Sequence, residues 1–218
     1  MSANRWPLLS VPVMNDEFTR CRGQYLSAFE QCGANAVFLA MRRSFDPVFL
    51  AEDFRRLAEN IALLKDAGYE VGCWLQAFGF GNPLPASEER FAGFTKITGM
   101  DGRTCGDAFC PADPRFTDFM AELVRRAARA GARLIMLDDD LCLNIRPGLG
   151  CACERHMALF RRRVGTQVER DSLKRLVYSG APTAYRRVWL DLMGGTLSDF
   201  CWAMRRAADE VDPTGTVR

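Results

Sequence analysis

Two groups of residues, close together in the sequence, have the types and spacing that chemistry requires. The first is a run of three carboxylates, Asp138, Asp139 and Asp140, at the end of an apolar segment that begins at Arg133. A short apolar run of this kind predicts a buried strand. Strand alternation would direct Asp138 and Asp140 to one face and Asp139 to the other. Carboxylates at the carboxyl end of a buried parallel strand are typical of an α/β active site. An acidic strand end that caps a helix or faces water is the alternative.

The second group is Cys151-x-Cys153-x-x-His156, which brings two thiols together with the only histidine of the chain. Thiolate and imidazole are ligands that tetrahedral Zn²⁺ takes readily, and a closed site with four such ligands is structural. The spacing is shorter than the usual C-x2-C pattern. Three loosely packed residues at the junction of a loop and a helix are therefore the alternative interpretation.

A fourth zinc ligand has to come from another part of the chain. Cys110 is the first choice, because it lies near the end of the stretch 79–115, whose glycines and prolines predict a long loop after the third strand. Loops that follow neighbouring parallel strands meet at the same end of the sheet. Cys105 and Cys142 are the alternatives to Cys110.

The elements that position these groups alternate between strand and helix. Apolar runs predict strands over residues 11–14, 36–41, 70–78 and 133–138. Helical patterns cover residues 18–32, 50–67, 114–130, 155–164, 171–178 and 189–211. The last of these helices contains Gly194-Gly195, which predicts a break. Residues 216–218 have the pattern of the first residues of a fifth strand.

Strands that are joined by helices predict an α/β fold with a parallel sheet and right-handed crossovers. Polar residues recur where strands end, at Asn15, at Arg42-Arg43, at Gln76 and at Asp138. This pattern favours the first half, about four βα units, of a TIM-type (β/α)8 barrel, with residues 1–218 as a single, partial catalytic domain. A self-contained open sheet is the alternative.

Composition limits the partners of the chain. A net charge of +2 without a long basic stripe argues against nucleic acid. No apolar run approaches the ~20 residues of a membrane helix, and residues 1–13 lack a charged region followed by an apolar core, so no signal peptide is expected there. Nine cysteines in a chain of 218 residues fit reduced thiols better than a disulfide framework, which predicts a cytoplasmic protein.

Four features occur in a fixed order between about residues 105 and 170. They are Phe-Cys-Pro-Ala-Asp-Pro-Arg-Phe at 109–116, the acids at 138–140, the cysteine–histidine group at 151–156 followed by Phe160, and Arg-Val-Gly-Thr at 163–166. In this order they resemble the catalytic barrel of glycoside hydrolase family 42 β-galactosidases. The corresponding family motifs are Tyr-Cys-Pro-x-x-Pro-x-Tyr/Phe, Asp-Asn-Glu, Cys-x-Cys-x-x-Cys and Arg-Tyr-Gly-Thr.

The resemblance implies a metal site and a catalytic acid. Cys110, Cys151, Cys153 and His156 would hold a structural zinc ion, with the histidine in place of the family's last cysteine. Asp140 would occupy the place of the family's general acid/base glutamate. The nucleophilic glutamate of the family belongs at the end of strand seven, outside the strands that this sequence shows.

The acids of this chain depart from the family pattern in two ways. Asp140 is one methylene shorter than glutamate, and Asp139 replaces an asparagine that contacts the sugar 2-hydroxyl in the family. A second charge raises the pKa of its neighbour by repulsion, which suits a general acid that must keep its proton. A cation site or a loss of catalysis are the alternatives.

A retaining glycosidase uses two carboxyl groups that lie ~5–5.5 Å apart. We expect Asp140 to act as general acid/base and Asp138 to orient it electrostatically. Asp139 either shares this task or points into the packing shell.

Substrate binding is predicted for residues at the strand ends. They are Asn15, Arg42, Arg43, Trp74 and Gln76. An aromatic face stacks on the apolar face of a pyranose, and the polar groups bind its hydroxyls. Core packing of Trp74 and pairing of the arginines with the acids are the alternatives.

The sequence thus predicts a glycoside hydrolase-like domain with a carbohydrate substrate, a β-glycoside of the galactoside kind. One competing class is a metal-dependent hydrolase in which Asp138 and Asp140 bind Mg²⁺ or Ca²⁺. Another is a non-catalytic carbohydrate-binding domain. A second copy of the chain is a further candidate partner, because the open sheet edges of a half barrel need cover.

Overall fold

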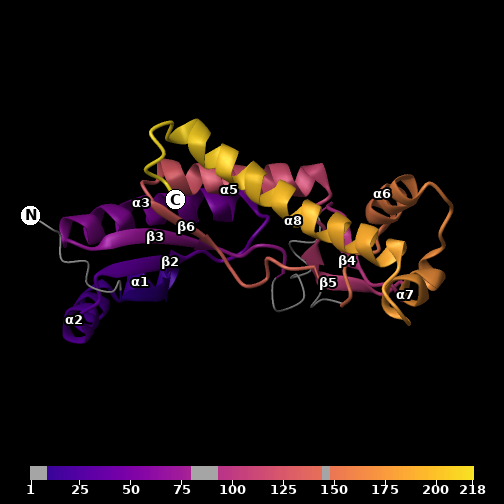
Figure 1. The fold of residues 1–218 in the computed structure, drawn as a ribbon. Coiled ribbons are helices and arrows are strands. Elements are labelled where there is room, and N and C mark those ends of the chain that lie inside the picture. The colour runs from indigo at the N-terminus through magenta and orange to yellow at the C-terminus, as the bar shows by residue number, and fades with distance from the viewer. Residues whose placement is uncertain (1–8, 80–92, 144–147) are drawn as a thin grey trace, which may run out of the picture. The chain divides into compact units, whose positions relative to one another are not determined.

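The computed structural model describes residues 9–79, 93–143 and 148–218 (Figure 1). The chain divides into two compact units, and each is described by itself. The first contains the residues up to Gln76 together with Glu122–Asp138 and Ala207–Arg218. The second contains Ala77–Ala121 and Asp139–Arg206. The single domain expected over residues 1–218 stays a prediction. Among the described residues, no helix combines the length and apolar character needed to cross a membrane.

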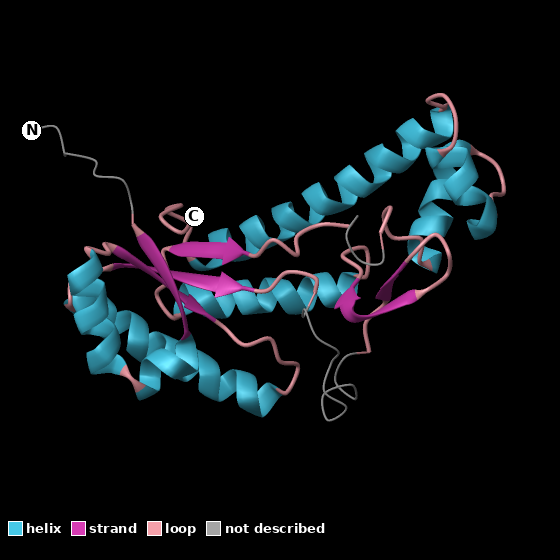
Figure 2. Cartoon of the chain, turned by 90° about the horizontal axis from the view of Figure 1, so that it is seen from below, coloured by secondary structure: helices cyan, strands magenta, loops and turns pink. Residues whose placement is uncertain are grey.

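The first unit is built on a four-stranded parallel sheet (Figure 2). Its strands are β1 (Ser10–Met14), β2 (Ala36–Ala40), β3 (Glu70–Leu75) and β6 (Leu134–Leu137), in the spatial order β1-β2-β3-β6. Each strand therefore lies beside the strand that precedes it in this set. With right-handed crossovers, this order places the connecting helices on one face, as in a (β/α)8 barrel. The predicted fold class is confirmed.

The two faces of this sheet differ in burial. One face carries the buried residues Val13, Val37, Leu39, Val71, Cys73 and Leu75, with the half-buried residues Val11, Ile135 and Leu137 on the outer strands. The other face carries Met14, Ala40, Trp74 and Met136, which are paired in register along neighbouring strands and only half-buried. A barrel would enclose this second face. In this chain its residues are partly exposed, so a ligand can reach the strand ends on this face.

The helices of the first unit begin where the sequence provides caps. The helix predicted over residues 18–32 is two helices, α1 (Asn15–Arg20) and α2 (Arg22–Cys32), because Cys21 leaves the helical conformation with φ −126° and ψ 32°. Helix α3 (Pro47–Asp66) begins before the predicted residue 50. Asp46 caps it by accepting hydrogen bonds from the backbone N–H groups of Val48 and Phe49, and proline occupies its first position.

The second unit contains an antiparallel ribbon that the sequence did not predict. Strands β4 (Lys96–Thr98) and β5 (Thr104–Phe109) lie inside the stretch 79–115, which was expected to be a loop. The strands are short, and a turn closed by the Gly99 N–H to Arg103 C=O hydrogen bond joins them, so neither strand shows an apolar alternation long enough to recognise. Residues 80–92 of the predicted loop lie outside the described residues.

Four further helices complete the described chain. They are α5 (Pro114–Arg129), α6 (Glu154–Val164), α7 (Arg170–Tyr178) and α8 (Ala184–Val211). The break predicted at Gly194-Gly195 is wrong, because α8 is continuous over 28 residues. Buried residues on both sides of the glycines, among them Trp189, Leu192 and Phe200, anchor the helix. Packing of an apolar face outweighs the low helix propensity of two glycines.

The predicted fifth strand is present only as a pairing of the last residue. The N–H of Arg218 donates to the carbonyl of Arg133, and the N–H of Ile135 donates to the carbonyl of Arg218. These two hydrogen bonds are the pattern of a parallel bridge at the free edge of β6.

Candidate functional site

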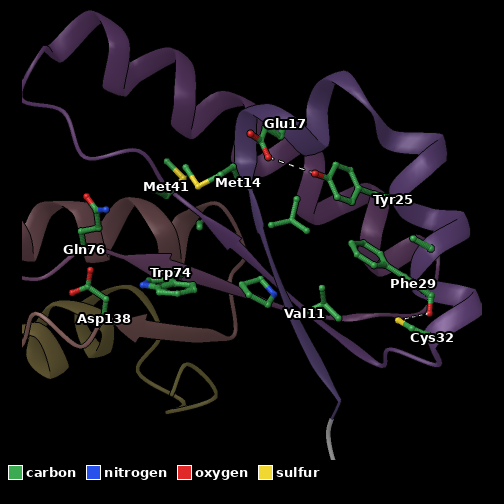
Figure 3. A pocket seen from close by; sticks show the side chains of 14 residues that line it. Val11, Met14, Glu17, Tyr25, Phe29, Cys32, Met41, Trp74, Gln76 and Asp138 are labelled. Carbon is green, nitrogen blue, oxygen red and sulfur yellow. Dashed lines mark hydrogen bonds between the residues drawn. The ribbon is translucent and has the colours of Figure 1, made fainter. Parts of the chain in front are cut away.

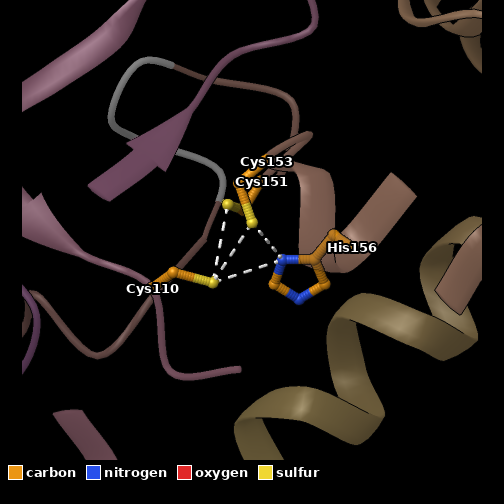
Figure 4. Close-up of side chains that lie close together, drawn as sticks. All are labelled: Cys110, Cys151, Cys153 and His156. Atoms are coloured by element: carbon orange, nitrogen blue, oxygen red, sulfur yellow. Dashed lines mark hydrogen bonds between the residues drawn. The ribbon is translucent and has the colours of Figure 1, made fainter. Parts of the chain in front are cut away.

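The second unit brings the two cysteines and the histidine together with Cys110. These residues, the Cys3His group, are Cys110, Cys151, Cys153 and His156, and all four are buried. Cys110 directly follows β5, Cys153 is the N-cap of α6, and His156 lies in the first turn of that helix. Figure 4 shows the three sulfur atoms and the imidazole Nδ1 facing one another. The group can hold a metal ion.

The distances within the Cys3His group fit tetrahedral coordination. The Sγ atom of Cys110 lies 3.4 Å from His156 Nδ1, 3.6 Å from Cys153 Sγ and 3.8 Å from Cys151 Sγ. Cys153 Sγ lies 3.6 Å from His156 Nδ1, and all four ligand atoms are within 4.8 Å of one another. An ideal tetrahedron with zinc bond lengths of about 2.0–2.3 Å separates its ligand atoms by about 3.5–3.8 Å. None of the nine cysteines forms a disulfide in the described structure.

Local contacts with α8 fix the position of the segment that contains Leu149, Gly150 and Cys151. Gly150 has φ +99°, and a Cβ atom there would approach Trp189 of α8 to 2.9 Å. The indole N–H of Trp189 donates to the carbonyl of Leu149, and the N–H of Cys151 points to Met193 Sδ at 3.3 Å. Only glycine permits this approach of the loop to the helix.

Asp113 fixes the segment that follows Cys110. Its buried carboxylate accepts hydrogen bonds from the N–H and hydroxyl of Thr95 and from the guanidinium of Arg115 at 2.9 Å. Burial opposes ionisation of this group, but the hydrogen bonds from Arg115 and Thr95 outweigh it and lower the pKa of Asp113. The N–H of Cys110 donates to the carbonyl of Thr95, so the same residue holds both ends of the segment.

The sulfur atoms are too close for three thiolates without a cation. Hydrogen bonds with Cys151 and Cys153, together with burial, raise the pKa of Cys110. Hydrogen bonds with Cys110 and Cys151 lower the pKa of Cys153. A divalent ion would stabilise the thiolate forms of all three cysteines.

The first unit contains a pocket of about 590 Å³, the sheet-end pocket, which Trp74, Gln76 and Asp138 line together with residues of β1, α1 and α2. Figure 3 shows Trp74, Gln76 and Asp138 toward one end and Tyr25 toward the other. The N–H of Asp138 donates to the carbonyl of Leu75, which continues the pairing of β6 with β3 by one residue. Three of the predicted site residues thus share one cavity of ordinary ligand size.

The other predicted binding residues have different surroundings. Asn15 is buried, and its amide donates to Asp53 and accepts from Asn60. Arg42 is about half exposed and forms an ion pair with Asp16 at 3.1 Å. The guanidinium of Arg43 lies 5.5 Å from the ring centre of Phe45. A binding role for these three residues stays a prediction.

The acidic run extends beyond the strand. Strand β6 ends at Leu137, and Asp139 and Asp140 lie in a turn. The expectation that strand alternation directs Asp138 and Asp140 to one face and Asp139 to the other is therefore wrong. Asp139 is exposed and Asp140 half-buried, and the N–H of Cys142 donates to the carbonyl of Asp140 at 2.7 Å. Asp138 belongs to the first unit, and Asp139 and Asp140 belong to the second.

The structure adds functional candidates that the sequence did not single out. Glu17 and Tyr25 line the sheet-end pocket, and the Tyr25 hydroxyl lies 3.5 Å from the Glu17 carboxylate. Glu17 lies three residues after β1, a position at which a strand-end carboxylate could have been recognised. Thr196 contacts His156 from α8, and no sequence signal links two residues 40 positions apart.

Comparisons with known proteins support the fold. No family model and no curated protein sequence matches the chain. The structure is similar to a solved β-galactosidase of the Antarctic haloarchaeon Halorubrum lacusprofundi, with a TM-score of 0.61, 14% identity and 94% of this chain covered. It is also similar to the cold-adapted β-galactosidase of Rahnella sp. R3, with a TM-score of 0.61, 13% identity and 97% covered. The chain spans about a third, 35%, of each of these proteins. These likenesses concern the fold alone: the α/β fold of this chain, with its parallel sheet, resembles about a third of each of these two proteins.

Proposed function

We propose that this chain is a glycoside hydrolase-like catalytic domain that binds a β-glycoside, of the galactoside kind, in the sheet-end pocket. The observation that carries the proposal is the meeting of Trp74, Gln76 and Asp138 in one pocket at the ends of adjacent parallel strands. Ligands of parallel α/β folds bind at this end of the strands. The order of the motifs from Cys110 to His156 supports membership in glycoside hydrolase family 42.

Each pocket residue has a chemical task in this proposal. The indole of Trp74 is half-buried on the open face of the sheet, where it stacks on the apolar face of a pyranose. The amide of Gln76 and the carboxylate of Asp138 bind sugar hydroxyls. Arg42 and Arg43, at the end of β2, and Asn15 complete the set of proposed binding residues.

Bond cleavage in this proposal depends on paired carboxyl groups. Asp140 donates a proton to the leaving oxygen as general acid and later takes one from water as general base. Asp138 orients it, and Asp139 is the third carboxylate of the proposed catalytic group. We assign the nucleophile to no described residue.

The Cys3His group has a structural task in the same proposal. Cys110, Cys151, Cys153 and His156 hold Zn²⁺, whose four protein ligands leave no open position for water. The ion supplies a cross-link between the segment after β5 and the N-terminus of α6. Reduced thiols of this kind fit a cytoplasmic protein.

Sugar binding is tested with a non-hydrolysable β-thiogalactoside and isothermal titration calorimetry. We expect Trp74→Ala to weaken binding by about 5- to 30-fold, since it removes the stacking surface, worth about 1–2 kcal/mol of buried apolar area. Trp202→Ala is the matched control, because Trp202 is 62% exposed on α8 in the other unit. Equal affinities of wild type and Trp74→Ala would contradict the proposal.

Catalysis is tested with aryl β-galactosides that differ in leaving group. We expect Asp140→Asn to lower kcat far more for poor leaving groups than for activated ones, because only the poor ones need a proton donor. Equal losses would argue against the acid role. Binding without turnover would select a non-catalytic carbohydrate-binding domain. Turnover that depends on added Mg²⁺ would select a metal-dependent hydrolase.

A further inference from the structure

The imidazole of His156 is held on the side opposite the sulfur atoms. Its Nε2 atom lies 3.1 Å from the hydroxyl of Thr196, and both residues are buried. The same hydroxyl donates to the backbone carbonyl of Leu192, four residues earlier in α8, at 2.9 Å. Thr196 is thus the middle member of a chain of hydrogen bonds that begins at His156.

The hydrogen-bond capacity of Thr196 decides the direction of this chain. A threonine hydroxyl has one proton to donate, and a carbonyl oxygen has none. Because the hydroxyl proton of Thr196 is donated to the backbone carbonyl of Leu192, the hydroxyl oxygen can only accept a hydrogen bond from His156. Nε2 therefore carries a proton, and in the neutral imidazole the lone pair lies on Nδ1.

From this arrangement we propose that Thr196 is a positioning residue that makes Nδ1 of His156 the metal-binding atom. Nδ1 faces Cys110 Sγ at 3.4 Å and Cys153 Sγ at 3.6 Å (Figure 4). Rotation of the imidazole by 180° about the Cβ–Cγ bond would break the hydrogen bond between Nε2 and Thr196. The Nε2–H group would then be buried without a partner. Thr196 therefore selects both the tautomer and the orientation of the ring. This inference rests on the proposed metal site.

Helix α8 thereby supports a ligand that belongs to α6. Metal-bound histidines commonly donate their second N–H to a fixed acceptor, and removing such an acceptor typically lowers metal affinity about 10- to 100-fold. Here the acceptor is itself fixed by Leu192 within the helix. A methyl group in place of the hydroxyl keeps the volume of the side chain but removes the acceptor.

The first measurement is a long-range ¹H–¹⁵N spectrum of the chain with ¹⁵N-labelled histidine. His156 is the only histidine, so one imidazole appears. We expect a protonated Nε2 and an unprotonated Nδ1, and we expect Zn²⁺ to shift the Nδ1 resonance while Nε2 keeps its proton. A protonated Nδ1, or a zinc shift on Nε2, would overturn the inference.

The second measurement compares Thr196→Val with Thr196→Ser by titration with Co²⁺, whose sulfur-to-metal absorption bands report ligation. Thr196→Val is expected to bind Co²⁺ about 10- to 100-fold more weakly than wild type. Thr196→Ser, which keeps the hydroxyl, should bind as wild type does. Equal affinities of all three would overturn the positioning role, and circular dichroism checks that the variants fold.

The two measurements separate this inference from the others. Wild type that takes up neither Zn²⁺ nor Co²⁺ overturns the metal site and, with it, ligation by Nδ1. Calorimetry with the β-thiogalactoside is a separate readout on the other unit, so failure of sugar binding leaves the Thr196 result standing. The spectrum of wild type also decides the tautomer if Thr196→Val fails to fold.

Discussion

At the residue scale, the Cys3His group consists of four buried side chains whose ligand atoms lie within 4.8 Å of one another. Its members are contributed by two segments that are about 40 residues apart, and the loop containing two of them is anchored by Gly150 against α8. Three thiols and one imidazole converge there, which is a donor set that Zn²⁺ takes readily. The group can therefore hold a metal ion.

Zinc content tests this explanation. We expect about one zinc ion per chain after purification without chelators, as a closed four-ligand site requires. Cys110→Ser should lose most of this zinc, whereas Cys105→Ser should keep it, because Cys105 hydrogen-bonds Asp107 outside the group. Elemental analysis measures both. A wild type without metal, whose nine thiols all react in the native state, would contradict the metal site.

At the element scale, two buried aspartates belong to different helical segments, and their pKa values are shifted in opposite directions. Asp53 of α3 is almost fully buried, and its pKa is raised, first by burial and also by the charge of Asp16, although the hydrogen bond from Asn15 opposes this. Asp113 precedes α5, and its pKa is lowered. The two residues should therefore influence stability with opposite dependence on pH.

We expect Asp53→Asn to raise Tm relative to wild type, and the difference should grow from pH 4 to pH 8. A raised pKa in the folded state contributes stability below the unfolded pKa of about 3.9, and that contribution is lost as pH rises through the folded pKa. Asparagine keeps an acceptor for Asn15 and carries no charge. Differential scanning fluorimetry over this pH range measures the effect.

Asp113→Asn is the matched comparison with the opposite sign. A group whose pKa is lowered in the folded state stabilises the fold at pH values above its unfolded-state pKa. This stabilisation is lost as the pH falls through the folded-state pKa. This variant should therefore cost more stability at pH 7 than near pH 3, where wild type has already lost part of the contribution. Parallel pH profiles for the two variants would contradict this explanation of both pKa shifts.

The glycines of α8 give a stability prediction for one element. Gly194 and Gly195 lie within a continuous helix, have no positive φ, and leave open space where a Cβ atom would be placed. Alanine at either position should raise the free energy of unfolding by about 0.5–1 kcal/mol, because glycine loses more backbone freedom on folding. Urea unfolding monitored by circular dichroism measures the change.

A control for the glycine substitutions comes from β3. Gly72 lies against Phe38, and a Cβ atom there would approach the ring to 2.4 Å. Gly72→Ala should therefore destabilise the first unit, since the rigid ring must move. If Gly194→Ala destabilised the protein as much as Gly72→Ala does, the prediction that alanine stabilises α8 would be wrong.

At the scale of the whole molecule, the sequence predicted features that repeat along the chain. The parallel sheet followed from short apolar runs such as 36–41 and from helical stretches between them. The meeting of Cys110 with Cys151, Cys153 and His156 followed from loops expected at the same sheet end and from the family motifs. These features depend on local pattern and on topology, both of which a sequence displays.

Other features depend on tertiary contacts and were not predictable. The ribbon of β4 and β5 has strands too short to show a period, and the continuity of α8 depends on packing by Trp189 and Phe200. The contact of Thr196 with His156 joins two helices that no motif connects. Strand β6 ends at Leu137, so Asp139 and Asp140 lie in a turn and not in the strand that the sequence predicted.

The central claim is that the sheet-end pocket binds a β-galactoside. A crystal structure of the chain with a saturating non-hydrolysable β-thiogalactoside tests it most directly. The account predicts a pyranose ring stacked on the indole of Trp74, with hydroxyl groups within hydrogen-bond distance of Gln76 or Asp138. An empty pocket at saturation, or a sugar bound only elsewhere on the chain, would contradict it.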